Sequence, residues 1–268
     1  MKKTVSTLLT AALAATTLLS CAKDDKTPNK AKQTYVLVHG AWQAPYVWNE
    51  VRNDLTSKNN NVVVVELPGH GTDNTPTHTL NLDVYRDKVI QQLSSIDGQV
   101  ILVGHSMGGM VVTAVAEKVP TKIRKLVYIG AFVPQSGQAL AEISDPQSQL
   151  GPSLIPSQDQ LTLDVKKEDL TNLFIADGSA QAKQLVIDNY RAEPAIPFGT
   201  KVTITPEHFG AVEKVYVKTL QDIVISPALQ DKMISAAGIK TIYSVNTSHS
   251  PFLSQPHQVS ELLLKIAQ

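Results

Sequence analysis

The sequence contains a single cysteine, Cys21, among its 268 residues, so a disulfide cannot form within the chain. Neither sign of charge is in excess, because 24 lysines and arginines balance 24 aspartates and glutamates, and aromatic side chains make up only 5% of the residues. Runs of lysine or arginine long enough to follow a phosphate backbone are also missing, which argues against a nucleic-acid partner. Hydrophobic side chains, at 43%, are abundant enough to bury one large α/β core.

The first 20 residues have the pattern of an export signal. Lys2 and Lys3 supply positive charge, Val5–Leu19 is a largely apolar stretch with small residues, and the stretch ends in Leu18-Leu19-Ser20-Cys21. This ending resembles the lipobox of bacterial lipoproteins, and the resemblance implies cleavage before Cys21 and lipid attachment to its sulfur. The alternative is an ordinary secretory signal that ends near Ser20.

Residues 21–33 are mostly polar and charged and lack hydrophobic periodicity, so they are predicted to form a flexible tether. Two or more acyl chains on Cys21 would hold such a tether durably at a membrane. Because Ala22 rather than an aspartate follows the cysteine, the resemblance to lipoproteins implies a place in the cell envelope, at the outer membrane.

From Thr34 onward, apolar runs of strand length alternate with helical patterns, which is typical of a mostly parallel sheet covered by helices. We therefore predict one α/β domain over residues 34–268. Residues 134–206 interrupt the alternation and are rich in Gln, Ser, Asp and Pro, so they are predicted to form a cap with helices near 167–176 and 180–190. Strands are predicted at 35–38, 62–66, 99–103, 125–129, 214–218 and 240–245, and helices at 45–57, 80–96, 109–118, 227–236 and 256–267.

The most informative motif is Gly104-His105-Ser106-Met107-Gly108, which lies between a predicted buried strand and a predicted helix. A strand, a tight turn with a serine and then a helix form a nucleophile elbow. The turn strains the serine backbone, and the residues two positions before and after it must lack a Cβ atom, as Gly104 and Gly108 do. The alternative is a glycine-rich turn in which the serine has no chemical role.

A serine hydroxyl becomes a good nucleophile when a histidine, oriented by a carboxylate, accepts its proton. In this type of fold the three residues follow in the order serine, acid, histidine. His249 follows the last predicted strand and Asp222 follows the one before it, so both lie at the sheet edge where Ser106 is expected. Glu213 and Asp231 are the nearest carboxylate alternatives. The other six histidines are expected to be structural or solvated: His39, His70, His78, His105, His208 and His257.

Negative charge on a substrate carbonyl oxygen requires fixed hydrogen-bond donors. The backbone N–H of Met107, directly after the serine, is one candidate. The second is the N–H of Ala41, in the loop after the first predicted strand, where Gly40 permits a sharp turn.

Several segments together resemble the α/β-hydrolases, and more narrowly their methylesterase, pyrethroid-esterase and hydroxynitrile-lyase group. The resemblance covers about residues 34–267 and rests on the stretches 36–42, 103–109, 131–134, 209–210, 215–217, 219–222 and 248–252. It implies an α/β-hydrolase fold with a mostly parallel central sheet flanked by helices, and a helical cap inserted after the sixth strand. It also implies ester hydrolysis through an acyl-serine intermediate, with neither a metal nor an organic cofactor.

Two positions favour the esterase branch. The lyases of this group carry a lysine directly after the catalytic histidine and a threonine where Gly40 stands, whereas this chain has Ser250 and Gly40. We therefore expect a serine carboxylesterase acting on small to medium, partly hydrophobic esters. The alternatives are a carbon–carbon lyase and a binding protein on the same fold. The oligomeric state and the natural ester are left open. The substrate pocket is expected to be lined by Trp42, Met107, Phe132, Leu140, Phe174 and Phe252.

Overall fold

The computed structural model describes residues 32–268. The predicted signal and most of the predicted tether, residues 1–31, lie outside the described residues, as does Cys21. Gln33, the last residue of the predicted tether, already pairs with the domain: its N–H donates to Asn60 Oδ1 at 3.1 Å and its carbonyl accepts from Asn61 N at 2.8 Å. Between residues 32 and 268, none of the helices is long and apolar enough to cross a bilayer.

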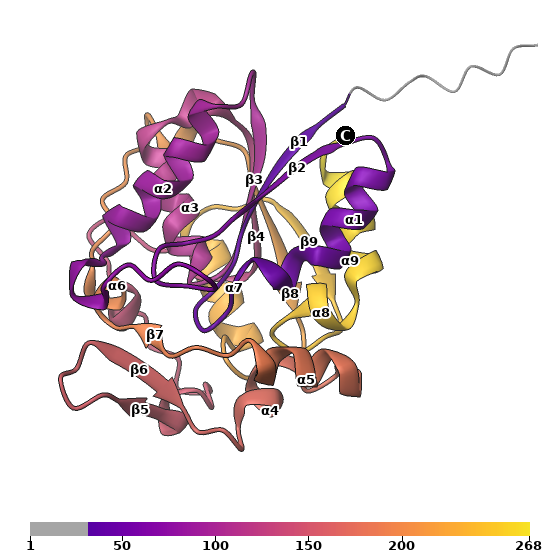
Figure 1. Cartoon of the computed structure of the whole chain (residues 1–268). Helices are drawn as coiled ribbons and strands as arrows, with labels where there is room; N and C mark the ends of the chain where they lie inside the picture. Colours follow the sequence, from indigo (N-terminus) through magenta and orange to yellow (C-terminus); the bar gives the residue numbers. More distant parts are fainter. Residues whose placement is uncertain (1–31) are drawn as a thin grey trace, which may run out of the picture. The chain divides into compact units, whose positions relative to one another are not determined.

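The core of the domain is a six-stranded parallel sheet in the order β2-β1-β3-β4-β8-β9 (Figure 1). Each predicted strand overlaps an observed one, so the predicted parallel sheet is confirmed. The strand before the serine is longer than predicted and includes the serine itself. The strands are β1 (Thr34–Val38), β2 (Asn61–Val65), β3 (Val100–Ser106), β4 (Ile123–Ala131), β8 (Lys214–Thr219) and β9 (Thr241–Val245).

Helices cover both faces of the sheet, which explains why the strands are continuous apolar runs. Val36 and Val38 of β1 face one apolar cluster, which includes residues of α2, α3 and α7, whereas Tyr35 and Leu37 face a second cluster with residues of α1, α8 and α9. These helices are α1 (Asn49–Ser57), α2 (Leu82–Ser94), α3 (Gly108–Lys118), α7 (Pro227–Ala236), α8 (Pro251–Ser254) and α9 (Pro256–Ile266).

Side chains that precede two of these helices explain where they begin. Asn81 accepts a hydrogen bond from Val84 N at 3.0 Å, and Ser226 accepts one from Leu229 N at 3.1 Å. Each bond satisfies an N–H that has no partner within the helix. Pro227, at the first position of α7, lacks the N–H that would otherwise need an acceptor.

The chain between β4 and β8 forms the cap. It follows the fourth strand rather than the sixth, because the sheet of the described chain begins at Thr34 and only three strands precede β4. The cap also contains a three-stranded antiparallel sheet, β5-β6-β7, that the prediction of a helical cap did not include. Figure 1 shows these elements beyond the carboxyl ends of the central strands. The cap elements are β5 (Leu154–Pro156), β6 (Thr162–Val165), α4 (Leu170–Ile175), α5 (Ala180–Asp188), β7 (Glu193–Pro194) and α6 (Ile196–Gly199).

Short 3-10 helices complete the connections, and one of them leads directly into α1. They lie at Pro45–Trp48, Thr77–Thr79, Pro120–Lys122, Leu140–Glu142, Gly151–Ser153 and Phe209–Ala211.

Candidate active site

The turn between β3 and α3 places Ser106 in a strained conformation. Its backbone φ is +52°, in the left-handed region that residues with a side chain seldom adopt. A Cβ atom at Gly104 would lie 2.7 Å from the carbonyl oxygen of Gly108, and one at Gly108 would lie 2.6 Å from that of His39. Both positions therefore require glycine, as the motif predicted.

Three side chains from different loops form one hydrogen-bonded chain at the carboxyl ends of the strands. His249 Nε2 lies 3.0 Å from Ser106 Oγ, and His249 Nδ1 lies 2.8 Å from Asp222 Oδ2. All three are almost fully buried, with exposed fractions of 5%, 1% and 2% for the serine, histidine and aspartate. Because a carboxylate only accepts, Nδ1 carries a proton and donates to it, which leaves Nε2 free to accept the serine proton.

The Asp222 carboxylate is held by its own loop in addition to the imidazole. Oδ1 accepts from the backbone N–H groups of Val224 at 2.8 Å and Ile225 at 2.9 Å. Oδ2 accepts from Thr219 Oγ1 at 2.8 Å. These donors fix the carboxylate in one orientation, and the carboxylate in turn fixes the imidazole.

A second buried histidine supports the loop that carries His249. His105 Nε2 donates to the carbonyl oxygen of His249 at 2.8 Å, and the two ring centroids lie 4.6 Å apart. Burial is the main reason that the pKa of His105 is well below its usual range, and the nearby His249 lowers it further. His105 is therefore neutral and acts as a structural donor, as expected for a histidine outside the triad.

The two predicted oxyanion donors lie next to the serine. Met107 directly precedes α3, where peptide N–H groups lack acceptors within the helix. The loop that carries Ala41 passes close above the elbow, because a Cβ atom at Gly40 would lie 2.7 Å from Ser106 Cβ. Ala41 and Met107 are both buried.

An aromatic side chain of the cap lies next to the imidazole and packs against a second one from the first loop. The rings of Trp42 and Phe174 are 5.6 Å apart, and Phe174 lies 6.1 Å from the ring of His249. Phe132 is connected to the elbow through its N–H, which donates to the carbonyl oxygen of Ser106 at 3.1 Å. Phe198, which was not predicted to lie here, also packs against Trp42, with ring centroids 5.8 Å apart.

One predicted pocket residue lies elsewhere. The ring of Phe252 is fully buried between Trp48, at 4.3 Å, and His105, at 4.6 Å, in the apolar cluster on the face of α1 and α9. It faces the core because α8 begins at Pro251 and packs against α1. Leu140 is buried in the apolar cluster that also contains Trp42, Phe132 and Phe174, and its short 3-10 helix contacts α6.

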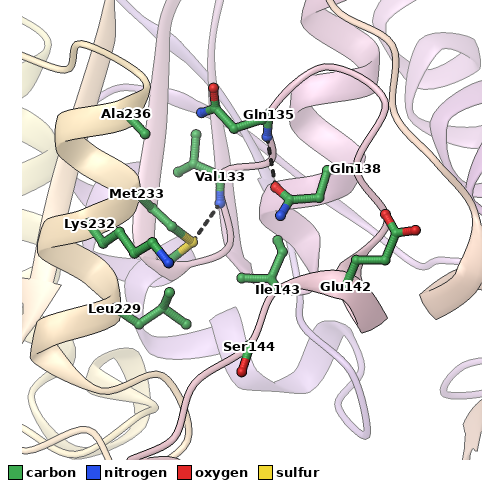
Figure 2. A pocket seen from close by; sticks show the side chains of 10 residues that line it. All are labelled: Val133, Gln135, Gln138, Glu142, Ile143, Ser144, Leu229, Lys232, Met233 and Ala236. Atoms are coloured by element: carbon green, nitrogen blue, oxygen red, sulfur yellow. Dashed lines mark hydrogen bonds between the residues drawn. The ribbon is translucent and has the colours of Figure 1, made fainter.

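A pocket of about 160 Å³ opens between the beginning of the cap and α7. Figure 2 shows Gln135, Gln138 and Glu142 on one side and Lys232 and Met233 on the other. None of its lining residues belongs to the Ser106–His249–Asp222 chain. Among residues 32–268, there is also no group of three or more histidine, cysteine, aspartate or glutamate side chains placed to hold a metal ion.

Comparisons with known proteins show what the chain is similar to. Residues 35–262 match the family described as "Alpha/beta hydrolase family". "Methylesterase 17" of Arabidopsis thaliana is 29% identical over 257 residues, which cover 90% of this chain and 93% of that protein. "Putative methylesterase 14, chloroplastic" of the same plant is 27% identical over 249 residues, covering 87% of this chain and 72% of that protein. The crystal structure of a pyrethroid hydrolase from Sphingobium faniae JZ-2 has a TM-score of 0.79 at 23% identity and covers 88% of this chain and 97% of its own, a likeness in fold.

Proposed function

The chain belongs to the alpha/beta hydrolase family, and from this premise we propose that it is a serine carboxylesterase of the EC 3.1.1 type. The observation that carries the proposal is the hydrogen-bonded chain from Ser106 Oγ through His249 to Asp222, with distances of 3.0 and 2.8 Å. The similarity to methylesterases supports ester bonds as the target.

In the proposed reaction, Ser106 Oγ attacks the ester carbonyl carbon while His249 Nε2 takes the hydroxyl proton. The resulting oxyanion accepts hydrogen bonds from the N–H groups of Ala41 and Met107. When the intermediate collapses, the bond to the alcohol breaks and the imidazolium returns its proton to the departing oxygen. Water then attacks the acyl-serine by the same route, with His249 as the base, and releases the acid.

The proposed substrate class rests on aromatic side chains that lie beside the imidazole, pack against its neighbour or adjoin the elbow. Trp42, Phe174 and Phe132 are apolar and contribute few polar groups, so we propose small to medium esters with a hydrophobic part as substrates.

The test is an ester panel in which acyl length and alcohol bulk vary independently, measured on the protein and on two serine variants. Ser106→Ala should abolish turnover and labelling by a fluorophosphonate probe. Ser260→Ala removes another buried hydroxyl, which donates to Pro256 O on α9, and should leave turnover unchanged. Turnover that survives in Ser106→Ala would exclude the proposed nucleophile. If the wild-type chain showed neither turnover nor labelling, a binding protein on this fold would be favoured.

The lyase alternative has less support. Ser250, where the lyases carry lysine, is fully buried, and its hydroxyl accepts a hydrogen bond from Gln43 Nε2 at 2.8 Å. A positive charge to hold cyanide is therefore not supplied at this position. Release of cyanide from mandelonitrile at a rate comparable to ester turnover would overturn this assignment.

We further propose that the protein is exported and anchored through lipid on Cys21, at the outer membrane of a bacterial envelope. The support is the sequence of residues 1–33 alone: positive start, apolar stretch and Leu-Leu-Ser-Cys ending. Mass spectrometry of the N-terminal peptide should find an acylated Cys21, and Cys21→Ser should release the protein from the membrane fraction. An unmodified N-terminus after Ser20 would favour an ordinary secretory signal.

A further inference from the structure

Three polar side chains outside the triad are buried together below the loop that carries Ala41. His39 and Glu193 are 0% exposed and His70 is 3% exposed. His39 and His70 come from loops after β1 and β2, whereas Glu193 belongs to β7 of the cap. The ring centroids of the two histidines lie 4.9 Å apart.

The contacts of His70 define its protonation state. Its Nε2 lies 2.8 Å from Glu193 Oε2, and its Nδ1 lies 3.0 Å from the carbonyl oxygen of Pro68. Both partners only accept, so both ring nitrogens must donate and the ring is an imidazolium. Burial alone would lower the pKa of His70, but the charge and hydrogen bond of Glu193, together with Pro68 O, outweigh it and raise that pKa. Glu193 and His70 are thus a buried ion pair.

His39 holds the peptide on the N-terminal side of Ala41. Its Nδ1–H donates to the carbonyl oxygen of Gly40 at 2.9 Å, while its Nε2 accepts from Leu67 N at 3.3 Å. The peptide between Gly40 and Ala41 is trans, so its C=O and N–H point in opposite directions. By binding the C=O, His39 directs the N–H of Ala41 away from itself.

Glu193 holds the peptide on the C-terminal side of Ala41. Its Oε2 accepts from the backbone N–H of Trp42 at 2.8 Å, and Trp42 has a φ of +57°, an unfavourable conformation for so large a residue. The indole Nε1–H of Trp42 donates to Leu163 O at 2.8 Å. Leu163 and Glu193 are direct partners across β6 and β7, so one cross-strand pair of the cap binds both N–H groups of Trp42.

We propose that Glu193 is a positioning residue of the oxyanion hole, which acts through the Trp42 N–H on the peptide of Ala41, with His70 balancing its charge. The inference rests on the proposed esterase function. Glu193 Oε1 has no hydrogen-bond partner among the described residues, so Oε2 alone makes the connection. The cap therefore sets the geometry of the loop that carries Ala41.

The primary test is Glu193→Gln. This variant keeps the shape of the side chain but removes the negative charge to which the Trp42 N–H and His70 both donate. We expect kcat for p-nitrophenyl butyrate to fall at least about tenfold, with KM within about twofold, because only transition-state stabilisation is lost. The selective readout is the ratio of this rate to that of the thiono ester, in which sulfur replaces the carbonyl oxygen. Sulfur accepts hydrogen bonds weakly, so the thiono ester gains little from the oxyanion hole. Damage to the hole therefore slows the oxygen ester more and lowers the ratio, whereas general destabilisation slows both esters alike.

The matched control is Glu117→Gln. Glu117 also binds the cap to the core, accepting from Thr205 N at 2.9 Å and Phe209 N at 3.2 Å, but its contacts are with the end of the cap. This variant should lower thermal stability and keep the wild-type kcat and rate ratio.

A second variant covers the case in which the single change does not fold. His70→Gln combined with Glu193→Gln removes both charges and leaves no buried charge unpaired, so it should fold and show the same fall in kcat and in the ratio. A wild-type ratio in a folded variant, with wild-type turnover dependent on Ser106, overturns this inference alone. Absence of turnover dependent on Ser106 in the wild-type protein overturns the proposed function, and this inference with it.

Discussion

Acidification should destabilise the fold through two histidines that are buried in their neutral form. His39 and His105 are both 0% exposed. Burial, assisted by the positive charge of His70, lowers the pKa of His39 to about 3. Burial and His249 likewise hold the pKa of His105 well below its usual range. In the unfolded chain both side chains would titrate near their ordinary pKa of about 6.5.

The size of the effect follows from proton linkage. Between about pH 6.5 and about pH 3 the unfolded chain binds a proton at His39 that the folded chain does not, which costs about 1.4 kcal/mol per pH unit once the pH is well below 6.5. The lowered pKa of His105 gives a loss of the same sign. At about pH 5 His39 alone reduces the free energy of unfolding by roughly 2 kcal/mol, a sizeable part of the usual 5–15 kcal/mol, and His105 adds to this loss. His70 does not add to this loss. Its pKa is raised in the folded state, so its contribution is fully present below the unfolded pKa and is lost only as the pH rises through the folded one.

The assay is urea unfolding, monitored by the fluorescence of the buried Trp42 and Trp48. It is carried out at several pH values between about 7 and about 5, which lie above the ordinary pKa values of aspartate and glutamate. His39→Asn keeps an N–H that can donate to Gly40 O but cannot titrate. Below about pH 6 its free energy of unfolding should depend on pH less steeply than that of the wild type, by a slope that approaches about 1.4 kcal/mol per pH unit. A wild-type protein whose free energy of unfolding falls by less than about 1 kcal/mol between pH 6.5 and pH 5 would show that His39 is not held in its neutral form by the fold.

Three further outcomes follow from single contacts. Asp222→Asn should lower kcat by about 10⁴ while the protein stays folded, because the amide leaves the imidazole in the wrong tautomer; a loss below tenfold in steady-state assays would contradict this. Gly109→Ala should destabilise severely in thermal unfolding, since its Cβ would lie 2.2 Å from a carbonyl oxygen, whereas Gly151→Ala, with no atom within 4 Å, should be neutral. Tyr216→Phe should cost about 1–3 kcal/mol in urea unfolding, because the hydroxyl that binds both the N–H and the C=O of Ala131, at 3.0 and 2.7 Å, is lost; an unchanged midpoint would argue against it.

The regular part of the fold was predictable because its signals are local. The strand that ends at Ser106 is apolar from Val100 to Val103 and buried at every position, and the glycines of the elbow are required by contacts of 2.6 and 2.7 Å. The order of serine, acid and histidine along the chain placed Asp222 and His249 at one sheet edge. The structure brings these residues together, since parallel strands end at that edge.

Side-chain direction after the last strand was not predictable in the same way. Phe252 lies three residues after His249, and hydrophobicity alone does not separate a pocket residue from a core residue. Its direction depends on α8, a helix of four residues that begins at Pro251. The small cap sheet was missed for a similar reason: β5 and β7 have three and two residues, too few to show an alternating pattern.

Glu193 lacked any local signal, because in the polar stretch Arg-Ala-Glu-Pro a glutamate is typical of an exposed loop. Its partners are Trp42, 151 residues earlier in the chain, and His70, 123 residues earlier. Burying a carboxylate completely costs free energy unless it is paired. Here one oxygen of Glu193 accepts hydrogen bonds from both the imidazolium of His70 and the backbone N–H of Trp42, a residue with a strained backbone conformation. Such a cost is tolerated where the geometry it imposes is needed, and the geometry here is that of the loop above Ser106. Substitutions in the cap would then change the rate of the chemical step as well as the preference among esters. An effect on the chemical step lowers both kcat and the ratio of the ester rate to the thiono-ester rate, which separates it from a change in preference.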